Sequence, residues 1–181
     1  MAQSDWTHRN YFEVVKDVMA PGFHAPPFSD SNLINGKMDY DCKLAPAGVA
    51  CTPNAGISKF KFHSGKTHRL RLINAGAEAI QRFTIDNHVL TVIANDFVPI
   101  KPYDTNMVTL GIGQRTDVLV KATGKPTDAV WMRSDISTTC SFGKNRNALA
   151  AIYYQKADTS MKPNSTATVY SDATCANVSS P

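Results

Sequence analysis

The sequence predicts an all-β protein, an antiparallel sandwich or barrel that carries one short helix near its N-terminus. Two observations lead to this prediction. Many short segments alternate apolar and polar residues, and clusters of Gly, Pro, Asn and Asp separate them, as in proteins built from strands joined by turns. Beyond residue 19 no segment has the spacing of a long helix. With 181 residues, of which 43% are hydrophobic, the chain can bury one core and carry a tail at each end.

The first element is the helix, expected at residues 11–19. Apolar side chains recur there at helical spacing, and Pro21-Gly22 ends the pattern. The apolar face of such a helix must pack against another surface. The Pro-rich residues 21–30 then predict an extended link, and Asn35-Gly36 predicts a turn after a short strand that begins at Leu33.

Strands account for most of the remaining chain. They are expected at residues 58–63, 68–73, 81–85, 89–94, 106–110, 114–122, 129–133 and 148–154. In the first of these, Phe60 and Phe62 alternate with lysines, so the rings should face the core. Rings that cover a core cannot stack on bases, which argues against a site for single-stranded nucleic acid. Residues 157–181 are rich in Ser and Thr and predict an extended C-terminal tail.

The charge pattern gives no indication of a nucleic-acid partner. Lys and Arg number 19 and Asp and Glu number 15, a formal net charge of +4, and the cations are spread along the chain. No apolar run approaches the roughly 20 residues of a membrane span. The first residues also lack the basic start and apolar stretch of a signal peptide, so the signal peptide of a secreted form would lie outside this chain.

The four cysteines form two local sets, Cys42 with Cys51 and Cys140 with Cys175. None has the Cys-x-x-Cys spacing of a zinc ribbon or a thioredoxin site, so disulfides are favoured over free buried thiols. By loop closure each disulfide would contribute roughly 2 to 4 kcal/mol to stability.

Two glycosylation acceptors lie near the C-terminus, at Asn164-Ser-Thr and Asn177-Val-Ser. Together with disulfides they indicate an oxidising compartment, because glycosylation and disulfide formation both belong to the secretory route. The sequence therefore predicts a secreted protein.

A copper site is not expected within this chain. A blue copper site takes two His, one Cys and usually a Met, and such sites commonly draw several of these ligands from one short loop. The sequence has no His-x-His pair and no His-Cys-His triplet, and its five histidines lie far from its cysteines. His63 and His68 flank a turn and could hold a metal at the surface, although exposed strand polars are the simpler interpretation.

Glu78 is the acidic residue of most interest. It lies among small residues in a loop between two strands, Ala75-Gly-Ala-Glu-Ala-Ile80, which could leave its carboxylate at a cleft. An ordinary surface Glu is the alternative. The other carboxylates show no pairing typical of acid/base catalysis. Asp117 should form a structural ion pair with Arg115, which precedes it by two residues on the same face of a strand.

Several motifs occur together and in order, and they resemble the middle domain of fungal, ascomycete-type laccase-like multicopper oxidases. The motifs are Asp5-Trp-Thr-His8, Pro27-Phe-Ser-Asp30, Leu33-Ile-Asn-Gly36, and the run from Thr67 to Glu78 continued by Ile93–Pro99 and Gly111–Val118. The resemblance implies a cupredoxin-like Greek-key β-sandwich, the second of three such domains. It divides the chain into an interdomain segment with the helix at 1–30, the cupredoxin-like domain at 31–156 and a C-terminal linker at 157–181.

This resemblance implies a secreted oxidase that oxidises phenols or similar reductants and reduces dioxygen to water. In the family the first and third domains bind the copper, so this chain by itself should bind none and should be inactive. The implied partners are these two domains and a phenolic small molecule, with no nucleic acid and no membrane.

The resemblance also implies roles for individual residues. Glu78 is similar in position to an acidic residue that receives the phenolic proton or orients the phenol, and Pro27 and Phe28 are similar to a segment near the same pocket. The resemblance further favours Cys140 joined to Cys175.

Two hypotheses follow from the start at Met1, directly before this domain, and from the lack of room for a third domain. The chain is expected to be either a piece of such an oxidase or a standalone, non-catalytic β-sandwich that serves as a binding or interaction module. Exposed apolar patches where neighbouring domains would dock favour the first hypothesis, and polar faces favour the second.

Overall fold

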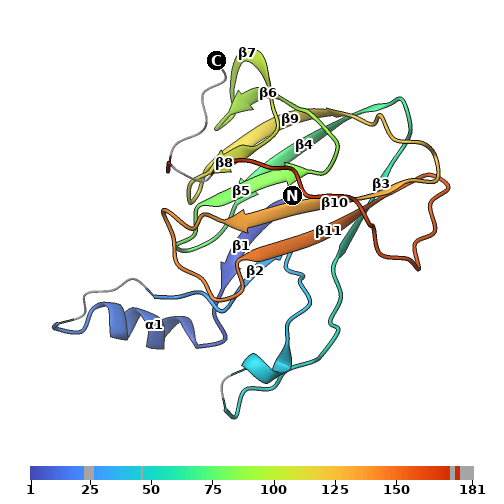
Figure 1. Ribbon diagram of the computed structural model, residues 1–181. Helices are drawn as coiled ribbons and strands as arrows, with labels where there is room; N and C mark the ends of the chain where they lie inside the picture. The colour runs from blue at the N-terminus through green and yellow to red at the C-terminus, as the bar shows by residue number, and fades with distance from the viewer. Residues whose placement is uncertain (23–26, 46, 172–173, 176–181) are drawn as a thin grey trace.

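The computed structural model describes residues 1–22, 27–45, 47–171 and 174–175 and shows a two-sheet β-sandwich with one short α-helix beside it (Figure 1). The predicted all-β fold class is confirmed. No helix in the described part of the chain is long and apolar enough to cross a membrane.

The first sheet has six strands in the order β2-β1-β4-β9-β6-β7. Its strands are β1 (Ala2–Trp6), β2 (Ser31–Ile34), β4 (Thr67–Asn74), β6 (Leu90–Asn95), β7 (Val98–Thr105) and β9 (Arg115–Lys121). Neighbouring strands are antiparallel except β1 and β4, which run parallel. A parallel pair needs a long connection, and here that connection holds the helix and two strands.

The second sheet has five strands in the order β3-β11-β10-β5-β8. They are β3 (Ser58–Phe62), β5 (Gln81–Ile85), β8 (Val108–Leu110), β10 (Ala129–Ile136) and β11 (Asn147–Tyr154). In this sheet β3 and β11 form the parallel pair. A short 3-10 helix, Cys42–Leu44, lies in the long loop between β2 and β3.

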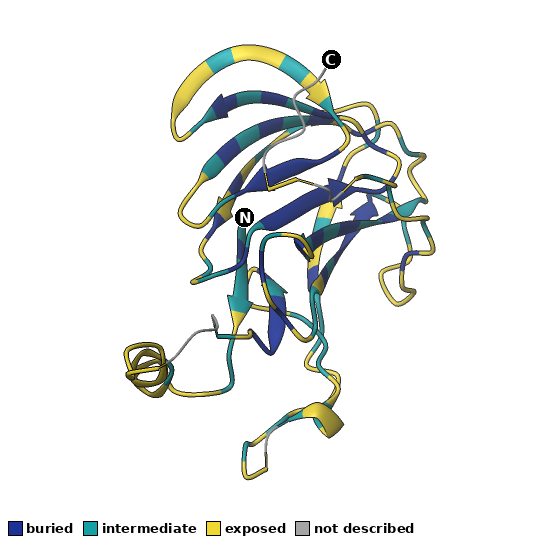
Figure 2. Cartoon of the chain, turned by 60° about the vertical axis from the view of Figure 1, so that its left-hand side comes forward, coloured by how far each residue is buried: buried dark blue, intermediate teal, exposed yellow. Residues whose placement is uncertain are grey.

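The hydrophobic core lies between the two sheets. In β6, β9 and β10 every second residue is buried, as the alternation in sequence predicts for strands with one face on a core. Phe62 is 2% exposed and Phe60 packs partly buried against the core, so the predicted inward orientation of these rings is confirmed. The alternation of buried and exposed residues is visible along the strands in Figure 2.

Strands β1 and β7 were not predicted. Strand β7 contains Pro99 and Pro102, which cannot donate to a strand ladder, but it forms an edge of its sheet, where prolines are tolerated. Strand β1 has a mostly polar sequence and pairs with both β2 and β4. Residues 2–6, expected in an interdomain segment, therefore contribute a strand to the first sheet.

Helix α1 (Tyr11–Val18) begins at the N-cap Asn10, whose side chain accepts a hydrogen bond of 2.9 Å from the amide of Phe12. Met19, predicted to be helical, is the C-cap residue. None of the helical residues is buried, and Phe12 and Met19 are each 77% exposed. The helix stands out beside the sandwich in Figure 2. Within the described chain, its predicted apolar face therefore remains largely open.

Residues 157–171 contain neither helix nor strand, in agreement with the predicted extended tail. They are nevertheless attached to the second sheet. The hydroxyl of Tyr153 donates to the carbonyl of Met161 at 2.9 Å, and the amide of Trp131 donates to Oγ of Ser165 at 2.9 Å. The tail thus covers part of the outer face of this sheet.

A buried ion pair lies beneath the tail. Asp86 is fully buried and accepts two hydrogen bonds of 2.8 Å from Nε and Nη2 of Arg133. Oγ of Ser165 donates a third, at 2.7 Å. This network joins β10, the turn after β5 and the C-terminal tail.

The predicted ion pair between Arg115 and Asp117 is wrong. Nε of Arg69 donates to Oδ2 of Asp117 at 3.0 Å, while Arg115 pairs with Asp96 at 3.3 Å. Residues on an adjacent strand lie closer to Asp117 than a residue two positions away along its own strand, so the cross-strand pair forms instead.

Candidate functional site

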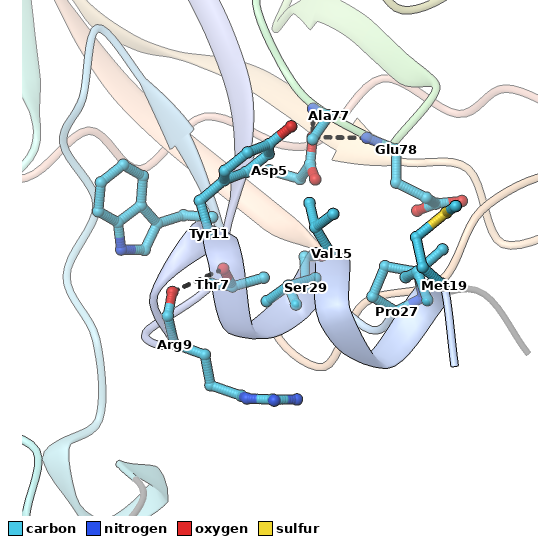
Figure 3. A pocket seen from close by; sticks show the side chains of 13 residues that line it. Asp5, Thr7, Arg9, Tyr11, Val15, Met19, Pro27, Ser29, Ala77 and Glu78 are labelled. Atoms are coloured by element: carbon cyan, nitrogen blue, oxygen red, sulfur yellow. Dashed lines mark hydrogen bonds between the residues drawn. The ribbon is translucent and has the colours of Figure 1, made fainter. Parts of the chain in front are cut away.

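A cavity of about 660 Å³ lies beside helix α1, and Figure 3 shows the side chains that line it. Apolar side chains of the helix and of its C-cap residue line one side of it, among them Tyr11, Val15 and Met19. Asp5 and Glu78 line it from the sandwich. A mostly apolar cavity with few polar groups is typical of sites for small organic molecules.

Glu78 is half-buried at this cavity, and Figure 3 shows its side chain extending from the loop toward the helix. Its Oε2 accepts a hydrogen bond of 3.3 Å from the amide of Phe142. Burial raises the pKa of Glu78 above its ordinary value, and the charge of Asp5 also raises it, against the effects of Phe142, Ser141 and Arg146. The carboxylate of Glu78 therefore takes up a proton more readily than an exposed one.

The loop that carries Glu78 is fixed by side chains from other segments. Nδ2 of Asn74, which is fully buried, donates to the carbonyls of Ala79 and Leu110 at 2.8 and 3.0 Å. Oγ of Ser141 accepts from the amide of Ile80 at 2.8 Å. These contacts leave the loop little freedom, so the position of the carboxylate is set by the fold.

Of the two other residues expected at a substrate pocket, the structure brings one to the cavity. Pro27 lines it together with Glu78. Phe28 does not line it; its ring is 51% exposed and meets the ring of Phe142 edge-to-face, with centroids 5.1 Å apart. Phe28 thus contacts the segment that donates to Glu78.

Some residues around this cavity were not identified from the sequence. Asp5 and Ser141 lie 73 and 63 positions from Glu78 in the chain, and neither belongs to a motif for acid/base chemistry. The helix was recognised by its apolar stripe, which could have suggested a cavity wall. Only folding brings these segments together.

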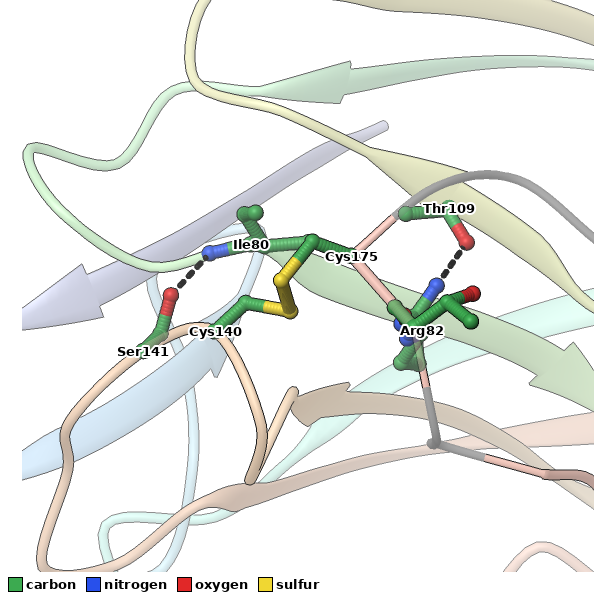
Figure 4. The surroundings of a disulfide bond; sticks show 7 residues. Ile80, Arg82, Thr109, Cys140, Ser141 and Cys175 are labelled. Atoms are coloured by element: carbon green, nitrogen blue, oxygen red, sulfur yellow. Dashed lines mark hydrogen bonds between the residues drawn. A yellow bond between two sulfur atoms is a disulfide. The ribbon is translucent and has the colours of Figure 1, made fainter.

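Both expected disulfides are present. Cys42 is joined to Cys51, and Cys140 to Cys175. The second bond lies next to Ser141, as Figure 4 shows. It therefore holds the C-terminal tail against the loop that contacts Glu78.

Arg82 anchors the tail close to the second disulfide. Its side chain is 1% exposed and donates to Oγ1 of Thr109 and to the carbonyl of Thr174. The first of these hydrogen bonds is drawn in Figure 4. The contact with Thr174 explains in part how an arginine on β5 can be buried.

The chemistry of the metal-binding side chains does not fit a copper site within the described residues. No group of three His, Cys, Asp or Glu side chains lies close enough together there to hold a metal ion, and all four cysteines are in disulfides. The amide of His63 donates to Nε2 of His68 at 3.2 Å. The ring of His68 stacks on Phe62, with centroids 4.1 Å apart, and burial lowers its pKa. This histidine pair is accounted for by packing.

Of the two glycosylation acceptors, Asn164 lies within the described residues. Asn164 is exposed, and so is Thr166, the third residue of its acceptor triplet. The side chain of Asn164 is therefore accessible to a glycosyl transferase. Asn177 lies outside the described residues.

Comparison with known sequences gives a family for the chain. The sequence model of the multicopper oxidase family matches residues 1–157. Laccase-2 of Botryotinia fuckeliana is 42% identical over 156 residues, which cover 86% of this chain and 26% of that protein. Oxidoreductase OpS5 of Beauveria bassiana is 40% identical over 163 residues, covering 90% of this chain and 27% of that protein.

Solved structures agree with this assignment. The laccase from Botrytis aclada superposes with a TM-score of 0.81 at 37% identity, over 96% of this chain and 31% of that one. The iron-import oxidase Fet3p superposes with a TM-score of 0.76 at 19% identity, which shows a shared fold. The sandwich is therefore cupredoxin-like. The chain spans about a quarter to a third of the length of the relatives it matches.

Proposed function

Because the chain belongs to the multicopper oxidase family, we propose that it is the middle cupredoxin-like domain of a secreted laccase-like oxidase. In the complete enzyme it contributes scaffold and one wall of the pocket for the reducing substrate. That enzyme oxidises phenols or similar reductants and reduces dioxygen to water. The observation that carries this proposal is a half-buried carboxylate, Glu78, at an apolar cavity on a chain that matches about a quarter of the length of a laccase.

The open face of helix α1 supports a place inside a larger enzyme. Tyr11, Phe12 and Met19 are 69%, 77% and 77% exposed. Large apolar side chains gathered on one helix are costly to leave in water, and such patches mark sites of association. The neighbouring domains of the same oxidase are the proposed occupants of the part of this face that lies outside the cavity. A standalone interaction module would be expected to carry a more polar helix.

Glu78 is the proposed substrate-binding residue. Its carboxylate accepts the phenolic O–H and takes the proton as the phenol gives up an electron, while the electron leaves to an acceptor outside this chain. A carboxylate whose pKa is raised by burial is better matched to this transfer than an exposed one. Pro27 and the apolar residues of α1 contact the ring and exclude water. The position of Phe28 suggests an indirect role, through its contact with Phe142.

Copper is the cofactor of the family, and we propose that the first and third domains bind it. The described residues of this chain do not supply a suitable donor set, since their cysteines are oxidised and no three donors meet. No step of the mechanism is assigned to copper in this domain.

Secretion is proposed from two features. Both pairs of cysteines form disulfides, which persist in oxidising compartments. Asn164 provides an exposed glycosylation acceptor. Mass spectrometry of the protein from its native source should therefore find a glycan at Asn164. An unmodified asparagine in fully secreted material would remove this support.

The coding sequence on either side of this chain tests its place in the enzyme. If it is a middle domain, the upstream sequence encodes His-x-His and the downstream sequence encodes His-Cys-His. A gene whose flanking sequence lacks both motifs would exclude the oxidase domain and leave the standalone module.

The role of Glu78 is tested by Glu78→Gln in the complete oxidase. Oxidation of a phenol should lose at least about tenfold in kcat/KM, because a hydrogen bond to a charged acceptor is lost together with the proton acceptor. Oxidation of ferrocyanide, which releases no proton, should be unchanged and serves as the control. Equal rates with the phenol for both enzymes would exclude the proposed role.

A further inference from the structure

Asp5 is the polar residue that contacts the Glu78 loop most extensively from strand β1. Its Oδ1 accepts a hydrogen bond of 2.8 Å from the amide of Ala77 and lies 3.4 Å from the amides of Glu78 and Ala79. These hydrogen bonds are drawn in part in Figure 3. Three consecutive amides thus point toward one carboxylate oxygen, an arrangement that holds a loop as a capping residue holds a helix.

The loop is shaped to accept this carboxylate. A Cβ atom added to Gly76 would overlap Oδ1 of Asp5 and would also come within 3.0 Å of Oδ1 of Asn74. Only a glycine leaves space for the side chain of Asp5 to reach the amides beyond it. The contact between β1 and the loop therefore depends on both Asp5 and Gly76.

Asp5 also contributes charge to the pocket. Both Asp5 and Glu78 line the cavity, and in the described part of the chain no lysine or arginine forms an ion pair with Asp5. The other charged group that acts on Glu78 is Arg146, which precedes β11. Arg9 lines the same cavity, but its guanidinium pairs with Asp17 on the helix. The negative charge of Asp5 is thus opposed locally by amides rather than by a cation.

We propose that Asp5 is the positioning residue of this pocket: it holds the backbone of residues 77–79 so that the side chain of Glu78 faces the cavity, and its charge acts on the Glu78 carboxylate. The significance of this role for phenol oxidation rests on the proposed function. The contacts themselves do not. A neighbouring negative charge favours proton uptake by a carboxylate, so Asp5 makes Glu78 a stronger base toward a substrate hydroxyl.

The chain offers an unusually clean test because it contains only two glutamates, Glu13 and Glu78. Selective 13C labelling of glutamate carboxyl groups gives two NMR signals, and loss of one in Glu78→Gln assigns them. Glu13 lies exposed on helix α1 and is an internal reference. The titration of Glu78 is then followed in the full chain without any need for oxidase activity.

The charge is tested with Asp5→Asn, which keeps a side-chain oxygen to accept from the amide of Ala77 but removes the negative charge. The midpoint of the Glu78 signal should shift to lower pH. Asp104→Asn removes one negative charge from the exposed edge strand β7, four strands away from β1 in the sheet, and should leave the midpoint unchanged. An unchanged or higher midpoint in Asp5→Asn overturns the electrostatic part of the proposal.

The positioning is tested by hydrogen exchange at the amide of Ala77. Asp5→Ala should speed this exchange at least about tenfold, whereas Asp5→Asn should retain most of the protection. Equal exchange in wild type and Asp5→Ala overturns the positioning role. If Asp5→Ala fails to fold, Gly76→Ala replaces it, because the added methyl group displaces the Asp5 side chain from the same amides while the aspartate itself is retained.

These outcomes are separate from those for the proposed function. If Glu78→Gln does not change phenol oxidation in the complete oxidase while Asp5→Asn still shifts the titration, the substrate role of Glu78 fails and the role of Asp5 stands. If the midpoint of the Glu78 titration does not shift in Asp5→Asn, the electrostatic role of Asp5 is excluded, whatever the kinetics of Glu78→Gln.

Discussion

The backbone amide of Phe142 donates a hydrogen bond of 3.3 Å to Oε2 of Glu78, which lies 64 positions earlier in the chain. Phe142 follows Cys140 by two residues, and Cys140 is joined to Cys175 in the C-terminal tail. The tail, the disulfide and the loop at the cavity therefore form one connected unit. Removal of the disulfide between Cys140 and Cys175 should therefore alter the environment of the Glu78 carboxylate.

Removal of this disulfide should destabilise the protein more than removal of the smaller one. The loop closed by Cys140 and Cys175 spans 35 positions, against 9 for Cys42 and Cys51. Loop closure predicts losses of about 4 and about 3 kcal/mol for the two double Cys→Ala variants. Urea unfolding with identical buffer conditions measures both. A larger loss for the Cys42 and Cys51 variant would contradict the prediction.

Loss of Arg133 should be strongly destabilising, because Arg133→Met leaves the fully buried carboxylate of Asp86 with a single hydrogen bond from the described residues, that of Ser165. A loss of about 3 to 5 kcal/mol is expected for breaking a buried pair from one side. Arg9→Met is the matched control, since the pair of Arg9 with Asp17 is exposed to solvent, and it should cost much less stability than Arg133→Met. Similar costs for both variants in thermal or urea unfolding would show that Asp86 finds another partner.

The stability of the chain should depend on pH through Glu78. Because the folded-state pKa of Glu78 is raised, its contribution is most favourable below the ordinary value of 4.5 and is lost as the pH rises through the folded-state pKa. Glu78→Gln stays neutral throughout. The variant should therefore match wild type in acid and become relatively more stable as the pH rises toward neutrality. Urea unfolding at several pH values measures the difference, and a difference that shrinks with rising pH would contradict this sign.

Replacement of the exposed apolar residues of α1 should improve solubility without loss of stability. Phe12→Ser and Met19→Ser change side chains that are each 77% exposed, so the free energy of unfolding should stay within about 0.5 kcal/mol of wild type. Leu72→Ala, at a fully buried position of β4, is the contrasting control and should cost about 2 to 5 kcal/mol. Sedimentation and thermal unfolding are the measurements. A large loss of stability in the double serine variant would mean that the helix packs on the sandwich after all.

The isolated chain, incubated with copper, should develop neither blue absorbance nor activity toward a phenolic dye. The reason is chemical: a blue site needs a thiolate, and the cysteines of this chain are in disulfides. The same measurements on the complete oxidase are the positive control. Blue absorbance in the isolated chain would show that a copper site assembles from its own residues.

Much of the fold follows from local patterns. The strands from Ser58 onward, except β7, were predicted because alternation of apolar and polar residues is a property of each short segment and survives in the folded sheet. The turn at Asn35-Gly36 is confirmed by positive φ angles at both residues. The N-terminal helix was predicted to within one residue, because the helical spacing of its apolar residues is likewise a property of one short segment.

Other features could not be read from local patterns. Strands β1 and β7 form because they pair with neighbouring strands. The sequence of β1 is mostly polar, and that of β7 contains two prolines. The predicted ion pair of Asp117 was wrong because its actual partner, Arg69, lies on a neighbouring strand that is distant in the sequence. No local pattern predicts burial of His88, which is only 7% exposed and whose Nε2 lies 2.7 Å from the hydroxyl of Tyr154.

The sequence by itself determined most of the strands, which cysteines are available for disulfides and that Glu78 is an acidic residue in a loop of small residues. Tertiary structure decided that this loop lies against Asp5 from β1, against Phe142 from beyond β10 and beside a helix that buries none of its residues. The physical reason is that a periodic pattern specifies which face of one segment is buried. The protonation and orientation of a carboxylate depend instead on charges and amides that come from distant parts of the chain, and only the folded sandwich brings them within hydrogen-bonding distance.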